Sequence, residues 1–161
     1  MSHQCSTLTP PPPSRTRTTA ARLPGYPAPP WATLPAQDGV SDQYALGRSG
    51  EAAAIRWYEE QGYTPLGSRV RCRDGEIDAI LRFTDGTVVF VEVKTRRGSA
   101  FGAAEAVTAK KLATMRRCAV EWLRRNAFGA HTTVRFDVVE IVYDGTAFLA
   151  HRFEGVEDGA C

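Results

Sequence analysis

The stretch GEIDAILRFTDGTVVFVEVKTR, residues 75–96, places charged residues inside two segments that otherwise have the pattern of buried strands. Asp78 lies in the first segment, and Glu92 and Lys94 lie in the second. A charged group in a strand interior is costly unless something pairs with it. The stretch therefore predicts a β-hairpin whose chemistry depends on what these three side chains contact.

The register of this hairpin decides whether the charged side chains meet. With a two-residue turn at Asp85 and Gly86, Asp78 lies opposite Val93 and points away from Glu92. Side chains alternate along a strand, so one residue of register moves every side chain to the other face. In this alternative the two carboxylates are separated by the sheet.

A three-residue loop with a left-handed Gly86 gives the other register. Asp78 then lies opposite Glu92, and Glu76 lies opposite Lys94, so that all four charged groups share one face. The opposite face then holds only apolar side chains: Ile77, Ala79, Leu81, Val89, Val91 and Val93. We favour this register because it separates the charged side chains from the apolar ones.

Two carboxylates opposite each other repel, by roughly 0.2–1 kcal/mol at an exposed site and by more when buried. A divalent cation between Asp78 and Glu92 would turn this repulsion into ligation, and oxygen ligands suit Mg²⁺ or Mn²⁺. Lys94 would then hold a water molecule or a phosphate oxygen. Metal-assisted phosphodiester hydrolysis needs a bound cation, an activated water molecule and a positive charge beside the phosphate. The alternative is a solvated hairpin in which Glu76 pairs with Lys94 and Glu92 pairs with an arginine.

Two expected helices supply further candidates for the same site. Glu51 lies beside the apolar stripe of the first helix, where the small residues Gly47 and Ala54 would let the helix approach the sheet. Lys110 and Lys111 lie in the first turn of the second helix, where a bound phosphate would account for their positive charge. The alternatives are a surface glutamate and two lysines that only aid solubility.

Several arginines are expected around the hairpin. They are Arg69, Arg71 and Arg73 in the strand before it, and Arg96 and Arg97 directly after Lys94. Together they would form a rim that binds a nucleic-acid backbone, although a charged edge strand is the alternative. Arg135 and Asp137 share one face of a later strand, and we assign them no chemistry.

The other elements follow from hydrophobic periodicity and turn residues. The sequence predicts a helix capped at Ser41 or Asp42 and ended by Gly62, then strands at about 66–73, 76–83 and 88–94. A helix at about 109–126, a strand at 132–143 and a short edge strand at 146–153 complete the order α-β-β-β-α-β-β. This order indicates an α/β protein with a mixed sheet and helices packed against it.

Residues 1–40 differ in composition from the rest. They contain all but one of the ten prolines, three arginines and no acidic residue before Asp38. Such a segment cannot bury enough apolar surface to offset its ordering entropy, so we expect a disordered tail. A transit peptide and a misplaced start codon are the alternatives. We expect one folded domain at 41–154 and a flexible end at 155–161.

Composition narrows the class of protein without identifying it. The chain is 43% hydrophobic and 24% charged, with a net charge of +2, and without the three tail arginines the remainder carries −1. No apolar run reaches the length of a membrane-spanning helix, and no signal-peptide core lies near the start. The scattered cysteines and histidines predict neither a zinc site nor a disulfide framework, which favours a reducing cytoplasm.

Five segments together resemble the YraN-type family of uncharacterised bacterial proteins. They are GxxGExxAxxW, GEIDAI, VVFVEVKTR, AVTAKK and RFDVV, and they lie within residues 44–143. Asp78 and the Glu92-Val93-Lys94 triplet across a hairpin, with Glu51 in a preceding helix, also resemble the PD-(D/E)XK nuclease superfamily. The family is similar to archaeal Holliday-junction resolvases, which implies a restriction-endonuclease-like mixed sheet flanked by helices.

The resemblance implies roles for individual residues. Asp78 and Glu92 would be metal ligands, Glu51 an additional acid from the helix, and Lys94 the catalytic lysine. Lys111 would contact a phosphate. The implied cofactor is Mg²⁺ or Mn²⁺, and the implied partner is nucleic acid, with DNA favoured.

Two functions of different classes follow. The first is a Mg²⁺-dependent endonuclease that hydrolyses phosphodiester bonds in DNA, including branched or recombination intermediates. Symmetric cutting of two strands would require a homodimer. The alternative is a non-catalytic module with a nuclease-like fold that binds nucleic acid or a protein partner, which the near-neutral charge of the domain favours. A structural protein with a solvated acidic hairpin is the third interpretation.

Overall fold

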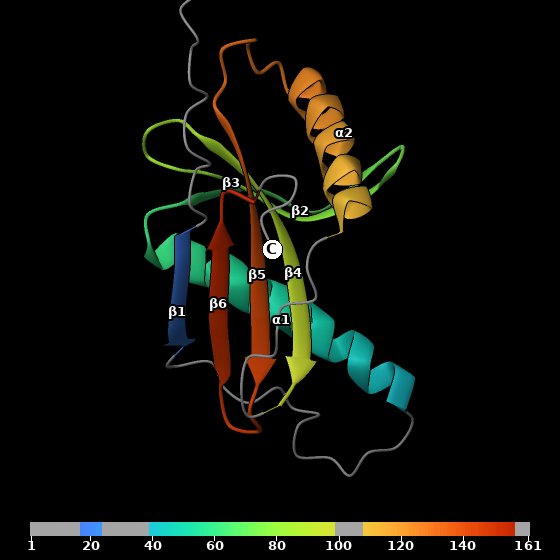
Figure 1. Ribbon diagram of the computed structural model, residues 1–161, viewed down its shortest axis with the longest axis vertical. Coiled ribbons are helices and arrows are strands. Elements are labelled where there is room, and N and C mark those ends of the chain that lie inside the picture. The colour runs from blue at the N-terminus through green and yellow to red at the C-terminus, as the bar shows by residue number, and fades with distance from the viewer. Residues whose placement is uncertain (1–16, 24–38, 99–107, 157–161) are drawn as a thin grey trace, which may run out of the picture.

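The protein is built around one mixed β-sheet (Figure 1). The computed structural model describes residues 17–23, 39–98 and 108–156. For residues 17–23 and 39–42 the backbone alone is described. The elements are β1 (Arg17–Leu23), α1 (Gly39–Glu60), β2 (Thr64–Cys72), β3 (Gly75–Arg82), β4 (Val88–Arg97), α2 (Ala109–Arg125), β5 (Val134–Tyr143) and β6 (Phe148–Glu154). The strand order is β1-β6-β5-β4-β3-β2, with β4 and β5 parallel and the other neighbours antiparallel. The predicted restriction-endonuclease-like class, a mixed sheet flanked by helices, is confirmed.

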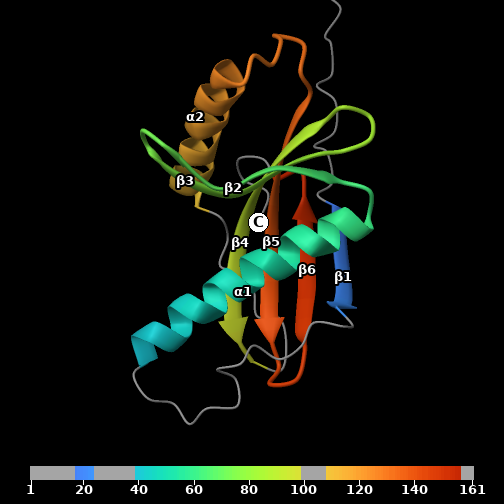
Figure 2. The same cartoon turned by 180° about the vertical axis from the view of Figure 1, so that it is seen from behind.

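The two helices cover opposite faces of the sheet. α1 crosses one face diagonally and stands in front of the sheet in Figure 2, whereas α2 lies on the other face beside the β2–β3 hairpin. Side chains alternate along the central strands, so Leu81 and Val89 pack under α1 while Ile80 and Phe90 pack under α2. No helix in the described ranges is long and apolar enough to cross a membrane.

The β3–β4 hairpin has the register that we favoured. Phe83 donates its N–H to the carbonyl of Thr87 at 2.9 Å, and Gly86 has a φ of +92°. Leu81 pairs with Val89, and Ala79 pairs with Val91. The three-residue loop is therefore confirmed, and the two-residue turn is excluded.

One side chain of this hairpin lies where we did not expect it. Ile77 packs in the core under α2, not with Ala79 and Leu81 under α1. The alternation along β3 breaks at Asp78, opposite Arg69 of β2, which is left-handed with a φ of +49°. The regular pairing of β3 with β4 also ends at Ala79, and beyond it the β2–β3 hairpin leaves the direction of β4 (Figure 2).

α1 approaches the sheet through a glycine other than the one we expected. A Cβ placed on Gly50 would lie 2.1 Å from Oγ1 of Thr95 on β4, whereas a Cβ on Gly47 would meet nothing within 4 Å. Gly50 therefore allows the backbone of α1 to come close to β4. The buried Ala54 lies one turn further along, as expected.

The outer strand of the sheet is formed by residues that we expected to be disordered. Arg17–Leu23 forms β1 and pairs antiparallel with β6, so β6 is not the edge strand that we expected. This segment contains no proline, and two adjacent threonines favour a strand once a partner edge is available. α1 also begins at Gly39, before the expected cap. The expected disorder of 1–16 and 24–38 and the flexible end after 156 lie outside the described residues.

A disulfide joins Cys72 at the end of β2 to Cys118 in α2, with their Cα atoms 5.4 Å apart. We expected no disulfide, because the two cysteines are separated by 46 residues and no spacing pattern links them. The fold brings them together by packing the β2–β3 hairpin against α2. The cross-link ties these two elements directly to each other.

Candidate active site

β3 and β4 separate where Asp78 faces Glu92. Their regular pairing ends at Ala79 and Val91, and the N–H of Val93 donates to Oδ2 of Asp78 at 2.7 Å. We call this position the strand fork. The hydrogen bond holds the carboxylate of Asp78 against the β4 backbone, next to Glu92.

Glu92 is a buried carboxylate that two lysines compensate. Its exposed fraction is 3%, which would be very costly for an unpaired charge. Nζ of Lys94 lies 2.9 Å from Oε1, and Nζ of Lys111 lies 2.7 Å from Oε2. The alternative of a solvated hairpin, in which Glu92 pairs with an arginine, is therefore wrong. Lys111 comes from α2, so two separate elements meet at this carboxylate.

Asp78 is held in a setting that disfavours its charge. Burial, and then repulsion from Glu92, raise the pKa of Asp78 to about 7, against the opposing effects of the Val93 N–H and Lys111. A carboxyl group with this pKa is close to half protonated at neutral pH. A cation bound at the strand fork would favour the ionised form.

Glu51 reaches the same region from α1. Burial is the main cause of its raised pKa, and the negative charges of Glu76 and Glu92 add to it. Nε of Arg69 lies 3.9 Å from Oε2 of Glu51 and lowers this pKa. Glu51 therefore lies near the acidic pair, with Arg69 as its counter-charge.

Glu76 does not lie opposite Lys94 in a regular ladder, because that ladder ends at Ala79. Its oxygens instead lie 3.4 Å from Arg69 and 3.5 Å from Arg71. The expected face of four charged groups is thus divided in two. Asp78, Glu92 and Lys94 belong to the strand fork, whereas Glu76 belongs to an arginine cluster on the β2–β3 hairpin.

The donor chemistry at the strand fork fits a divalent cation. Asp78 and Glu92 offer carboxylate oxygens whose mutual repulsion a cation would relieve, and oxygen is the ligand that Mg²⁺ prefers. Across residues 17–23, 39–98 and 108–156, no group of three or more His, Cys, Asp or Glu is placed closely enough to hold an ion. The site therefore offers two carboxylates that could hold a cation, with Glu51 nearby.

The predicted nucleic-acid-binding residues fall into three places. Lys111 lies in the site, and the exposed Lys110 precedes it at the start of α2. The second place is the tip of the β2–β3 hairpin, which carries the exposed Arg71 and Arg73. The third is the end of β4, where Arg96 turns toward Glu140 and Arg97 lines a shallow pocket with Tyr143 and Asp144. The structure does not gather all of them into one patch.

Glu140 is a buried acid that our sequence analysis missed. It is 3% exposed, it lies beside Lys94 in the parallel register, and Nε of Arg96 contacts its Oε1 at 2.6 Å. Within the described part of the chain its Oε2 has no hydrogen-bond partner. A charge inside the apolar run VVEIVY is the same signal that marked Glu92, and it could have been recognised.

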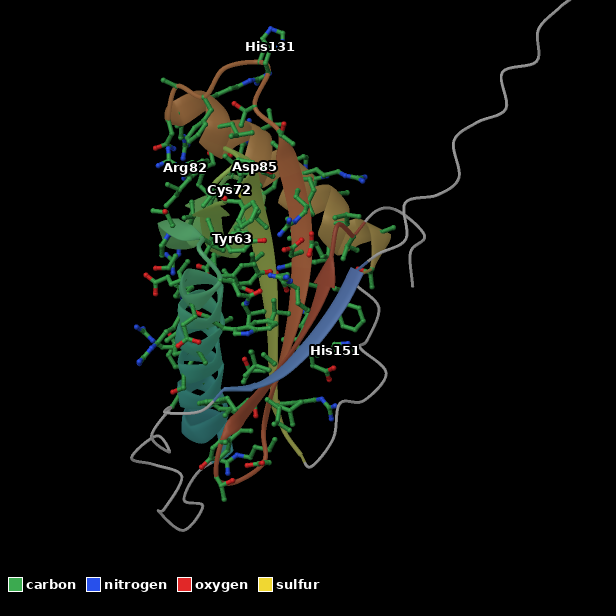
Figure 3. The ribbon with its side chains drawn as sticks, turned by 90° about the vertical axis from the view of Figure 1, so that its left-hand side faces the viewer. Tyr63, Cys72, Arg82, Asp85, His131 and His151 are labelled. Atoms are coloured by element: carbon green, nitrogen blue, oxygen red, sulfur yellow. A yellow bond between two sulfur atoms is a disulfide. The ribbon has the colours of Figure 1, made fainter. Side chains whose placement is uncertain are left out.

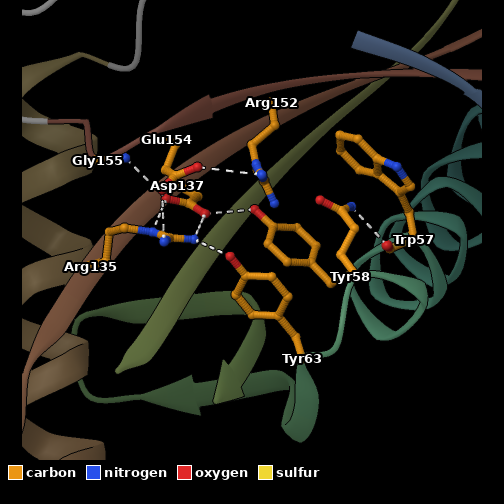
Figure 4. A network of polar contacts seen from close by, with 9 residues as sticks. Trp57, Tyr58, Tyr63, Arg135, Asp137, Arg152, Glu154 and Gly155 are labelled. Carbon is orange, nitrogen blue, oxygen red and sulfur yellow. Dashed lines mark hydrogen bonds and ion pairs between the residues drawn. The ribbon is translucent and has the colours of Figure 1, made fainter. Parts of the chain in front are cut away.

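Arg135 and Asp137 of RFDVV belong to a polar network that joins α1, β5 and β6 (Figure 4). Asp137 is fully buried, and both of its oxygens accept hydrogen bonds from Arg135, at 2.9 and 2.8 Å. Tyr58 of α1 and the N–H of Gly155 also donate to it, at 2.8 and 3.0 Å. With both oxygens engaged, Asp137 connects α1 and the segment after β6 to β5.

The two histidines that the structure describes lie apart from each other. Figure 3 places His131 at one tip of the molecule, whereas His151 lies on β6, where it pairs with Glu140 of β5. His3 lies outside the described residues. Among the described residues, the contacts that define the strand fork come from carboxylates and lysines.

The fold and the strand fork together define a class: a restriction-endonuclease-like protein of the PD-(D/E)XK type. Within this class the chain belongs to the uncharacterised protein family UPF0102, which matches residues 50–141. This is the YraN-type family that the five sequence segments resemble. The match spans Glu51, the strand fork and Lys111.

Relatives of this family resemble the chain over most of their length. The UPF0102 protein of Corynebacterium efficiens is 47% identical over 123 residues, which cover 74% of this chain and 98% of the relative. That of Corynebacterium glutamicum is 50% identical over 118 residues (71% and 93%), and that of Bifidobacterium longum subsp. infantis is 44% identical over 112 residues (68% and 90%). None of these names states an activity.

Among solved structures, SfsA of Pyrococcus furiosus in complex with Ca²⁺ is 14% identical, with a TM-score of 0.25, over 74% of this chain and 65% of that one. A likeness this weak carries no argument about the present chain.

Proposed function

We propose that this protein is a metal-dependent nuclease that hydrolyses phosphodiester bonds in DNA, and that branched or recombination intermediates are among its substrates. One observation carries the proposal: the buried Glu92 lies beside a second carboxylate, Asp78, and is contacted by two lysines. A fold gains no stability from an acid placed where burial and the charge of Glu92 raise its pKa, as they do for Asp78. Such an arrangement is typical of sites that bind a cation and an anion together.

Asp78 and Glu92 would hold Mg²⁺ or Mn²⁺, with Glu51 as a further acid. The bound ion would supply an activated water and would offset charge on the phosphate. Lys94, about half exposed beside Glu92, would orient the water or a phosphate oxygen. Lys111 would exchange its contact with Glu92 for a contact with the phosphate once the carboxylate charge is neutralised.

The alternative is a non-catalytic module with the same fold. It is favoured by the absence, within the described ranges, of a ready group of three ligands, and by the contact of Lys111 with the Glu92 oxygen that an ion would use. In this case the strand fork would bind nucleic acid or a partner without cutting. Cleavage of DNA that depends on a divalent metal would distinguish the nuclease from the binding module.

The deciding experiment incubates the full chain with labelled single-stranded, duplex, flap and four-way-junction DNA in Mg²⁺, in Mn²⁺ or in EDTA. Asp78→Ala and Lys94→Ala are the test variants, and Glu60→Gln, on an exposed part of α1, is the control. We expect metal-dependent cutting that both test variants abolish and the control retains. Nucleic-acid binding without cutting by any version would instead support the binding module.

The melting temperature gives a second readout that does not depend on activity. Mg²⁺ should raise it for the parent protein and for Glu60→Gln, because an ion that binds the folded state stabilises it by mass action. The increase should be much smaller for Asp78→Ala. An equal increase in all three proteins would contradict metal binding at the strand fork.

A further inference from the structure

Tyr44, near the start of α1, is an aromatic side chain that the fold leaves in solvent. It is 58% exposed, and the only other exposed large hydrophobic side chain in the described part of the protein is Val120, at 47%. The remaining aromatic residues of α1, Trp57 and Tyr58, are buried against the sheet. Packing of the core therefore does not explain an aromatic residue at position 44.

Two arginines lie around this ring. Cζ of Arg69 is 5.6 Å from the ring centre, and Nη1 of Arg69 donates to the hydroxyl at 3.3 Å. Hydrogen bonds from Arg48 and Arg69 lower the pKa of Tyr44. Positive charge at an exposed ring suits a ligand that offers both an aromatic face and an anion, as a nucleotide does.

Arg69 reaches the ring through an unusual backbone conformation. Its φ of +49° is in the left-handed region, which is unfavourable for a residue with a side chain. Ser68 pairs with Ala79 and Val70 pairs with Ile77, so Arg69 lies between these pairs, at the level of Asp78. Strain of this kind is concentrated at functional sites. Here the guanidinium of the left-handed residue contacts Tyr44, Glu51 and Glu76.

The exposed ring is close to the candidate active site. Tyr44 precedes Glu51 by seven residues on α1, so both lie on one face of the helix, roughly 10 Å apart along its axis. Arg69 contacts both of them. A distance of this size corresponds to one or two nucleotides of an extended strand.

We propose that Tyr44, with Arg48 and Arg69, is a stacking site for an unpaired base of the strand whose phosphate lies at Asp78 and Glu92. This inference rests on the proposed function and adds a substrate class, nucleic acid with a single-stranded segment beside the cleavage site. A base paired inside a duplex has no free face for the ring, whereas single strands, flaps and junction openings do. Arg48 and Arg69 would contact the adjacent phosphates.

The test measures binding without cutting. Fluorescence anisotropy in EDTA would follow a labelled single-stranded oligonucleotide and a duplex of the same length with the full chain. Tyr44→Ala should weaken single-strand binding about 5- to 150-fold, the range expected for one stacked base. Tyr44→Trp should retain the affinity, because it keeps an aromatic face, and Val120→Ala, the matched loss of an exposed apolar side chain, should change nothing.

The outcomes separate this inference from the nuclease proposal. An unchanged affinity in Tyr44→Ala, an equal loss for the duplex, or no binding to either probe by the parent protein would overturn the stacking site. Selective loss of single-strand binding, with no version cutting DNA in Mg²⁺ or Mn²⁺, would support the stacking site while the nuclease proposal fails. Melting temperatures of the variants would confirm that each one is folded.

Discussion

Glu92 shows how a charged residue can occupy the interior of a strand. Its burial is compensated by Lys94 from the same strand and by Lys111 from α2. A single neighbouring lysine could have been inferred from the alternation of side chains along β4. The contact of Lys111 depends on where α2 packs. The charge of Glu92 is therefore balanced by residues from two elements, β4 and α2.

Removing Lys111 should cost stability that removing its neighbour does not. Lys111→Ala leaves the second oxygen of Glu92 without a counter-charge, so we expect the free energy of unfolding to fall by about 1–3 kcal/mol. Lys110→Ala, at the exposed preceding position, should stay within about 0.5 kcal/mol of the parent. Urea unfolding of the three proteins at low ionic strength would measure this. Equal effects of the two substitutions would contradict the ion pair with Glu92.

Asp78 should make stability depend on pH. Its folded pKa of about 7 lies above the ordinary 3.8, so between these values the folded chain holds a proton that the unfolded chain releases. This stabilisation is present below about pH 4 and is lost as the pH rises to 7. Asp78→Asn, which retains an acceptor for the Val93 N–H, should therefore become increasingly more stable than the parent over this range, by about 1.4 kcal/mol per pKa unit at most.

Urea unfolding of the parent and of Asp78→Asn at several pH values between 4 and 8 would measure the difference. Asp85→Asn is the control. Hydrogen bonds from Thr87 lower the pKa of this exposed turn carboxylate from its ordinary 3.8, so its contribution is lost only below about pH 4 and the control should differ from the parent by a constant amount between pH 4 and 8. A difference between the parent and Asp78→Asn that does not vary with pH would show that burial and Glu92 do not shift the titration of Asp78.

At the scale of elements, the site depends on how closely α1 packs on β4. Gly50 lies against Thr95, and the next residue, Glu51, is the acid nearest to the strand fork on this helix. The sequence indicated small residues on this side of the helix but not which of them makes the close contact. That choice depends on the rotation and the crossing position of α1, which are tertiary properties.

Two glycine substitutions in α1 should differ in their effect on the free energy of unfolding. Gly50→Ala forces the helix away from Thr95 and should destabilise the protein by about 1–3 kcal/mol. Gly47→Ala meets open space and should be neutral, or stabilising by up to about 1 kcal/mol, because alanine favours a helix. Thermal unfolding of both variants would test this. Destabilisation by Gly47→Ala equal to that by Gly50→Ala would contradict the close approach at Gly50.

At the scale of the whole molecule, the disulfide between Cys72 and Cys118 links the β2–β3 hairpin to α2, which carry Asp78 and Lys111 respectively. A cross-link of this loop length stabilises by about 4 kcal/mol in the chain-entropy account. We expect a reductant to lower the melting temperature of the oxidised parent by several degrees and to leave Cys72→Ser unchanged. Mass spectrometry after alkylation would confirm the redox state. The same response to reductant in both proteins would contradict the cross-link.

Much of the site was predictable because it lies within one hairpin. The turn residues and the alternation of side chains fixed the register that brings Asp78 opposite Glu92, and the structure has that register. The other contacts cross long sequence distances. Lys111, Arg69 and Glu140 reach the site or its borders from three different elements, and periodicity within one element carries no information about such neighbours.

The sequence by itself determined the elements from α1 to β6, the β3–β4 register, the α/β class and the neighbouring positions of Asp78 and Glu92, because each follows from local patterns of side chains and turns. The tertiary structure alone decided that β1 covers β6, that Cys72 meets Cys118, that Gly50 packs on Thr95 and that Lys111 compensates Glu92. It also left Tyr44 exposed beside Arg69. These contacts join residues far apart in the chain, so they depend on how the helices and the twisted hairpin pack on the sheet.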